Sequence, residues 1–148
     1  MLLIKMKTFK ELIILIAEDD NGHAELIQEG LKEAGVCNKM IRFENGEDAW
    51  NFISRTGTGI IRDPSKAYLL LLDINMPRMN GIEVLQRIKA DQDLKQIPII
   101  MLTTTDDPRE VETCYRLGCS IYITKPVQFD KFAETLRRMG LFIQIVKI

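Results

Sequence analysis

Short apolar runs recur along the chain, and polar or turn-forming residues bound each of them. The runs stand at residues 12–17, 68–72, 99–102 and 121–123, with a shorter mixed segment at 40–43. An apolar run of this length without alternation is typical of a strand that is buried on both faces. The pattern therefore predicts five strands, and Asp73 stands at the end of a central one.

Between these runs, apolar residues recur three and four positions apart, which predicts helices. The clearest stripes are Ala24/Ile27/Leu31/Ala34, Ile82/Leu85/Ile88, Val111/Cys114/Leu117 and Phe129/Phe132/Leu136/Met139, with a shorter helix around residues 49–53. Asp107-Pro108-Arg109-Glu110 is a strong helix start, and Gly35 and Gly118 suit helix ends. The segment 55–66, rich in polar residues, glycine and proline, is expected to be a surface loop.

The elements alternate as β-α five times, which predicts an α/β fold with a parallel sheet and helices on both faces. Right-handed crossovers leave few topologies for such a chain, and the flavodoxin-like doubly wound order 2-1-3-4-5 fits its length. In that order strands one, three and four are neighbours. Their carboxyl ends carry Asp19, Asp73 and Thr103.

Carboxylates follow two of these neighbouring strands. Glu18-Asp19-Asp20 comes directly after residues 12–17, and Asp73 comes directly after residues 68–72. Parallel sheets bind ligands at this edge, so the acids are expected to converge there. Because like charges repel, such a cluster calls for a divalent cation. Asp20 is expected to cap the following helix, and His23 to lie on the surface of that helix.

Composition narrows the classes of protein. The 148 residues suggest one domain, spanning 1–148 with a core at about 10–139, and 46% hydrophobic residues can form a core. A net charge of -1 argues against general affinity for nucleic acid. Three cysteines without metal spacing suggest reduced thiols. The apolar run at 12–17 is too short for a signal peptide, and no run reaches transmembrane length, so a cytoplasmic protein without membrane contact is expected.

Four segments together resemble the response regulator receiver domain of two-component signalling. They are residues 16–20 (Ile-Ala-Glu-Asp-Asp), 72–77 (Leu-Asp-Ile-Asn-Met-Pro) with Gly81, 98–104 (Pro-Ile-Ile-Met-Leu-Thr-Thr) and 122–126 (Tyr-Ile-Thr-Lys-Pro). Each segment alone is weak, but all four in this order are specific. The loop at 55–66, whose role the sequence does not reveal, and the apolar C-terminal tail resemble small single-domain regulators, including those paired with bacterial phytochromes.

The resemblance implies a role for each site residue. Asp73 would accept the phosphoryl group, Thr103, Thr104 and Lys125 would bind its oxygens, and Thr103 and Tyr122 would form the switch. A Mg²⁺ ion, or Mn²⁺ in its place, would be bound directly by Asp19, Asp73 and the carbonyl of Asn75, and by Glu18 largely through water. The family also suggests a cis Lys125–Pro126 bond, and a face of Val111, Tyr115 and Tyr122 that changes shape for a partner.

The partners follow from the same resemblance. A sensor histidine kinase, phytochrome-type or hybrid, would donate the phosphoryl group, and a downstream phosphotransfer protein or another contact would read it. Too few residues follow the last predicted helix for an output domain. The chain is therefore expected to be a signalling protein that catalyses only its own Mg-dependent phosphorylation and dephosphorylation.

Three alternative functions compete with this interpretation. A phosphatase of the haloacid dehalogenase type needs a second acid two residues after the nucleophile, where this chain has Asn75. A flavin- or nucleotide-binding module needs a phosphate-binding loop where Glu18-Asp19-Asp20 would repel phosphate. A receiver-like module that is never phosphorylated would be expected to have lost Asp73, Thr103 or Lys125.

The C-terminal segment 140–148 is unusually apolar for a chain end. Two alternatives stay open: the segment folds back over its own domain, or it continues the last helix past Gly140 and forms a homodimer.

Overall fold

Five parallel strands form one sheet in the computed structural model, which describes residues 12–145. The strands are β1 (Ile13–Ala17), β2 (Met40–Phe43), β3 (Tyr68–Leu72), β4 (Ile99–Thr103) and β5 (Ile121–Thr124). Their order across the sheet is β2-β1-β3-β4-β5, and every pairing is parallel. The predicted fold class and strand order are confirmed.

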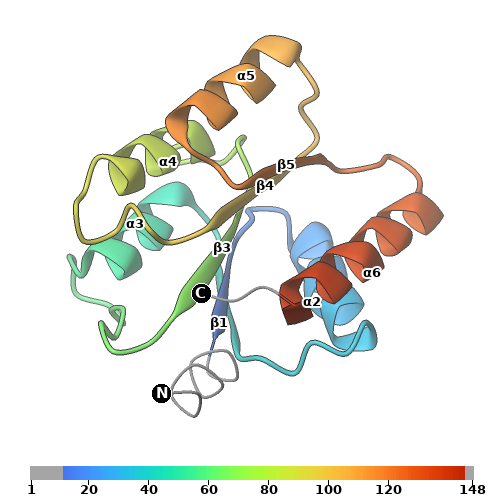
Figure 1. The fold of residues 1–148 in the computed structure, drawn as a ribbon, viewed down its shortest axis with the longest axis horizontal. Helices are drawn as coiled ribbons and strands as arrows, with labels where there is room; N and C mark the ends of the chain where they lie inside the picture. The colour runs from blue at the N-terminus through green and yellow to red at the C-terminus, as the bar shows by residue number, and fades with distance from the viewer. Residues whose placement is uncertain (1–11, 146–148) are drawn as a thin grey trace.

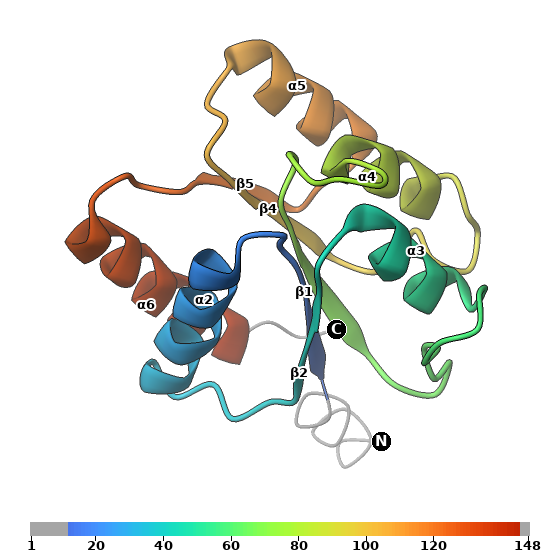
Figure 2. The same ribbon diagram turned by 180° about the vertical axis from the view of Figure 1, so that it is seen from behind.

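Helices cover both faces of the sheet (Figures 1 and 2). The helices are α2 (Asn21–Glu33), α3 (Gly46–Ser54), α4 (Gly81–Lys89), α5 (Pro108–Leu117) and α6 (Phe129–Ile145). One face is covered by α2 and α6, and the other by α3, α4 and α5. The predicted loop at 55–66 connects α3 to β3, and the Arg62 guanidinium fastens it by donating to the Ile53 carbonyl at 2.8 Å.

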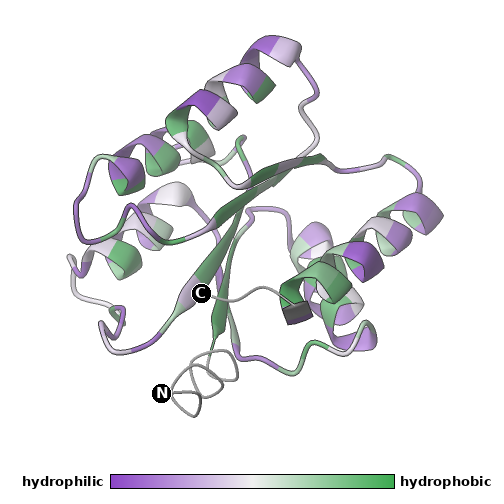
Figure 3. Cartoon of the chain, in the orientation of Figure 1, coloured by the Kyte–Doolittle hydropathy of each residue, from purple (hydrophilic) through white to green (hydrophobic). Residues whose placement is uncertain are grey.

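The central strands are buried on both faces because alternate side chains enter two different cores. In β3, Leu70 and Leu72 pack with α3, α4 and α5, whereas Leu69 and Leu71 pack with α2 and α6. Figure 3 shows the resulting apolar strands between helices with polar outer surfaces. This double burial explains why the sequence runs are continuous rather than alternating.

Side chains cap the helices that begin near the carboxyl edge of the sheet. The carboxylate of Asp20 accepts from the His23 N–H, which confirms the predicted cap of α2. Asp107 caps α5, with Pro108 at its start as predicted, and Gly118 ends it at a φ of 108°. Asn45 caps α3, where its side chain accepts from the Asp48 N–H.

The C-terminal segment combines features of both alternatives. Helix α6 runs through Gly140 without a break to Ile145. Its continuation nevertheless packs on its own domain: Ile143 is buried, and the Gln144 amide donates to the Ala34 carbonyl at 2.7 Å. Leu141 and Phe142 stay exposed, and residues 146–148 lie outside the described part. None of the helices within residues 12–145 has the length and apolarity to cross a membrane.

Helices α2 and α6 approach so closely at Gly140 that a side chain there would collide with its neighbour. A Cβ at Gly140 would lie 2.6 Å from the Ala34 Cβ. We expect Gly140→Ala to lower the free energy of unfolding by about 1–2 kcal/mol, because the clash outweighs the gain of about 1 kcal/mol in helix propensity. Urea denaturation followed by circular dichroism measures the change.

The matched control is the double variant Ala34→Gly/Gly140→Ala, which moves the methyl group to the other helix. It should recover most of the lost stability. A Gly140→Ala protein as stable as the wild type would contradict this packing of α6 on α2.

Candidate functional site

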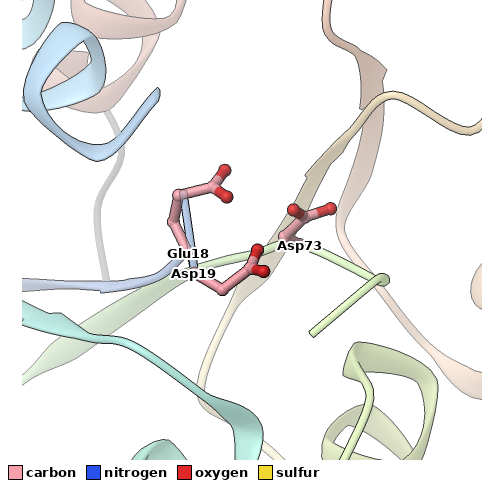
Figure 4. Close-up of side chains that lie close together, drawn as sticks. All are labelled: Glu18, Asp19 and Asp73. Atoms are coloured by element: carbon pink, nitrogen blue, oxygen red, sulfur yellow. The ribbon is translucent and has the colours of Figure 1, made fainter. Parts of the chain in front are cut away.

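The carboxylates predicted to converge do so at the carboxyl edge of the sheet. Glu18 and Asp19 follow β1, and Asp73 follows β3. The Asp73 N–H donates to the Ala17 carbonyl at 3.1 Å, which continues the pairing of the two strands and places Asp73 beside the end of β1. Each of these three residues offers a carboxylate oxygen within 4.8 Å of the others. Figure 4 shows the three side chains gathered at the two strand ends. The structure thus confirms their predicted proximity.

Burial makes the negative charges of this cluster energetically unfavourable. Glu18 and Asp73 are buried, whereas Asp19 is exposed. Desolvation raises the pKa of the Glu18 carboxyl to about 7, in spite of the hydrogen bond and charge of Lys125, and the negative charge of Asp73 adds to the rise. Three carboxylates gather around the single ammonium group of Lys125, so negative charge exceeds positive charge in the cluster. Closely spaced carboxylate oxygens with too little positive charge suit a hard divalent cation, so these residues fit such an ion.

Lys125 is the one buried basic side chain among residues 12–145. It follows β5, and its ammonium group forms ion pairs with Glu18 and, at 3.3 Å, with Asp73. A lysine is rarely buried unless it is paired. The structure therefore brings the predicted lysine to the predicted nucleophile. The Lys125–Pro126 bond is trans, however, because no cis peptide occurs within residues 12–145, and the expected cis bond is wrong. The trans bond already places Lys125 against Asp73, so aiming the side chain needs no cis peptide.

Thr103 ends β4 with a fully buried side chain. Its hydroxyl group has no hydrogen-bond partner within the described chain. A buried hydroxyl without a partner is unfavourable by about 1–3 kcal/mol, so the position suits a group that would bind to it. Thr104 follows it and is exposed at the same edge of the sheet.

A second group of polar residues surrounds Thr105 in the loop after β4. The Tyr122 hydroxyl donates to the Thr105 carbonyl at 2.6 Å, and the Asn75 amide donates to the Thr105 hydroxyl at 3.1 Å. Partial burial raises the pKa of the Tyr122 phenol to about 12, so the phenol stays a hydrogen-bond donor at neutral pH. Asn75, after β3, and Tyr122, on β5, are thereby linked through this loop.

The loop after Asp73 returns close to the backbone of Asp73 and fixes its position. The Gly81 N–H donates to the Ile74 carbonyl at 2.8 Å, and a Cβ at Gly81 would lie 2.0 Å from the Asp73 carbonyl oxygen. Only glycine permits so close an approach. Steric contact with the Asp73 carbonyl therefore explains why the sequence motif has a glycine at position 81.

Sequence reasoning missed two contributors to the site. Arg42 on β2 donates to the Glu18 carbonyl at 2.9 Å and to the Asn21 side chain at 2.8 Å. These bonds hold residues 18–20, which we call the acidic loop, in place after β1. His23, expected at the surface, is half-buried with its Nδ1 3.3 Å from the Lys125 ammonium. The predicted position of β2 beside β1 could have indicated that Arg42 lies near the residues that follow β1. Nothing in the sequence connects His23 with Lys125.

Comparisons with known proteins agree with this geometry. The model of the response regulator receiver domain matches residues 14–137. The chain is 35% identical over 113 residues to response regulator Rcp1 of Synechocystis, covering 76% of each protein. A Mn(2+)-bound crystal structure of Rcp1 has a TM-score of 0.82 at 30% identity, covering 92% of this chain and 97% of that one.

Two further structures are similar to this chain. A response regulator receiver domain from Rhodospirillum rubrum has a TM-score of 0.84 at 41% identity and covers 92% of this chain and 96% of that one. The phosphorylated cyanobacterial phytochrome response regulator RcpA has a TM-score of 0.82 at 29% identity, with 91% and 95% covered. The chain belongs to the family of response regulator receiver domains.

Proposed function

We propose that this chain is a stand-alone response regulator that accepts a phosphoryl group on Asp73 from a sensor histidine kinase. One observation carries the proposal: Asp73 lies at a strand end beside two further carboxylates, and it forms an ion pair with the ammonium group of a buried lysine. The phosphorylated state of RcpA, a similar protein, supports it. The similarity of this chain to phytochrome response regulators favours a phytochrome-type kinase as the donor.

The chemistry needs little beyond positioning and charge neutralisation. A carboxylate oxygen of Asp73 attacks phosphorus while the bond from phosphorus to the histidine nitrogen of the kinase breaks. The nitrogen keeps the bonding electrons and takes a proton from water. Lys125 and the Thr103 hydroxyl bind phosphoryl oxygens, and the Thr104 N–H adds a further donor. When water later attacks phosphorus, the carboxylate of Asp73 is released again.

A divalent cation completes this site. Glu18, Asp19, Asp73 and the Asn75 carbonyl would hold it, and its charge would neutralise the phosphoryl oxygens. Mg²⁺ is the expected ion, and the Mn(2+)-bound structure of the similar protein Rcp1 supports Mn²⁺ as a substitute. The excess of three carboxylates over one ammonium group supports the need for added positive charge.

Two alternative functions are disfavoured: a phosphatase of the haloacid dehalogenase type, and a receiver-like module that is never phosphorylated. The amide of Asn75 hydrogen-bonds to Thr105 and cannot act as the general acid of a dehalogenase-type phosphatase. A receiver that is never phosphorylated would have no use for a buried Thr103 hydroxyl without a hydrogen-bond partner at the end of β4. The chain acts on no separate substrate in this proposal.

The signal would leave the site through Thr103 and Tyr122. When Thr103 moves to bind the phosphoryl group, the loop that follows it shifts, and the Tyr122 hydroxyl must release or follow the Thr105 carbonyl. The surface formed by Val111, Tyr115 and Tyr122 then changes for a downstream partner. We place these events in the cytoplasm, where a sensor kinase holds its phosphohistidine.

Asp73→Asn tests the phosphoacceptor directly. The amide is a poor nucleophile, so this variant should take no label from a phosphorylated kinase or from acetyl phosphate, whereas the wild type should take one label per chain. Autoradiography and intact-mass spectrometry measure both. Persistent acid-stable labelling of Asp73→Asn on another residue would contradict the assignment.

Asp19→Ala and Asp20→Ala form a matched pair for the cation site. Asp19 belongs to the carboxylate cluster, whereas Asp20 caps α2. Asp19→Ala should weaken Mg²⁺ binding at least tenfold, and Asp20→Ala should mainly lower stability by about 1 kcal/mol. Calorimetric titration with Mg²⁺ distinguishes them, and EDTA should abolish phosphorylation of the wild type. Equal losses of Mg²⁺ affinity would show that the acid pair is misassigned.

We also propose that α6 forms a homodimer through its exposed end. Leu141 and Phe142 are 55% and 41% exposed, which is unfavourable for large apolar side chains in water. The double variant Leu141→Ser/Phe142→Ser keeps the buried Ile143 and should shift sedimentation toward the monomer. Val127→Ser, at a fully exposed position outside α6, is the control. A wild type that is monomeric at every concentration, phosphorylated or not, excludes the dimer.

A further inference from the structure

The ammonium group of Lys125 has one acceptor for each of its donors. An ammonium group carries three N–H donors and accepts nothing. Its neighbours are the Glu18 carboxylate, the Asp73 carboxylate at 3.3 Å and the His23 Nδ1 at 3.3 Å. With only 1% of its side chain exposed, Lys125 has little access to water. His23 therefore completes the coordination of this ammonium group.

His23 is itself held in place from two other directions. Its backbone N–H donates to the capping carboxylate of Asp20 at 2.9 Å, which fixes its position in the first turn of α2. Its ring packs against buried Phe132 of α6, with ring centroids 5.8 Å apart. Because Lys125 can only donate, Nδ1 must be the unprotonated nitrogen of a neutral imidazole. The imidazole is thus a fixed acceptor beside the site.

We propose that His23 is a positioning residue for phosphoryl transfer, with its Nδ1 anchoring the Lys125 ammonium toward Asp73. The inference rests on the proposed function of Asp73. Lysine has a long, flexible side chain, so an ammonium anchored by Glu18 alone would sample several orientations. Two fixed acceptors leave the third donor aimed at Asp73, where it binds a phosphoryl oxygen after transfer.

A neutral acceptor suits this position better than a charged one. A further carboxylate would hold Lys125 more strongly, but it would repel the incoming phosphoryl group and add to the charge of Glu18, Asp19 and Asp73. A neutral imidazole orients the ammonium group without adding negative charge. Lys125 therefore keeps its electrostatic attraction for the phosphoryl oxygens.

His23→Phe and His23→Asn separate this role from packing. Phenylalanine keeps a ring against Phe132 but removes the acceptor, whereas the asparagine oxygen can replace Nδ1 near its position. We expect His23→Phe to lower the rate of phosphorylation by acetyl phosphate, and the affinity for beryllofluoride, about tenfold. His23→Asn should recover a substantial part of both. Glu25→Gln, exposed on the same helix, is the control and should match the wild type.

A measurement on the unphosphorylated protein tests the contact separately. His23 is the chain's single histidine, so ¹⁵N NMR shows one imidazole. Its Nδ1 signal should shift in Lys125→Gln, with circular dichroism confirming the fold. An unshifted Nδ1 signal, or a His23→Phe protein that is phosphorylated as fast as the wild type, overturns the inference while leaving Asp73 as the acceptor. A wild type that takes no phosphoryl group overturns the proposed function. If the His23 Nδ1 signal still differs between that wild type and Lys125→Gln, the contact is structural only.

Discussion

Repulsion among the carboxylates of Glu18, Asp19 and Asp73 is the constraint on which the rest of the site depends. These groups lie close enough to share a cation, and two of them are buried. The ammonium group of Lys125 offsets part of this repulsion, but burial still raises the pKa of the Glu18 carboxyl to about 7, and the charge of Asp73 adds to the rise. A site in this condition gains from any bound positive charge. The expected cation answers that need, and it would also offset the further negative charge that the proposed acyl phosphate brings.

The fold keeps these charges together because their positions are fixed by strongly buried elements. The ladder between β1 and β3 sets Asp73 beside the end of β1, and large apolar cores on both faces prevent either strand from sliding. The close return of the chain at Gly81 fixes the backbone of Asp73, and Arg42 holds the acidic loop from β2. Packing energy distributed over the whole domain thus sustains an unfavourable local arrangement.

The same rigidity would allow the proposed switch to carry a small shift at the site to the surface. Thr103 is buried with an unused hydroxyl, and two residues later the Thr105 carbonyl accepts from Tyr122. Asn75, immediately beyond the proposed acceptor, bonds to the Thr105 side chain. In the proposed switch, a shift of Thr103 would therefore reach Tyr122, because the Tyr122 hydroxyl on β5 is bonded to the carbonyl of Thr105, two residues after Thr103. The connection needs no large domain motion.

The sequence by itself determined the alternation of strands and helices, the strand order and the convergence of Asp73 with the acidic loop. These follow from local patterns and from the rule that parallel strands end at one edge. Only the tertiary structure decided the contact of His23 with Lys125, the close packing at Gly140 and the trans Lys125–Pro126 bond. Side chains far apart in the sequence meet only through the packing of α2 against α6 and the sheet. Local patterns do not encode that geometry, because it depends on the shapes of all the elements together.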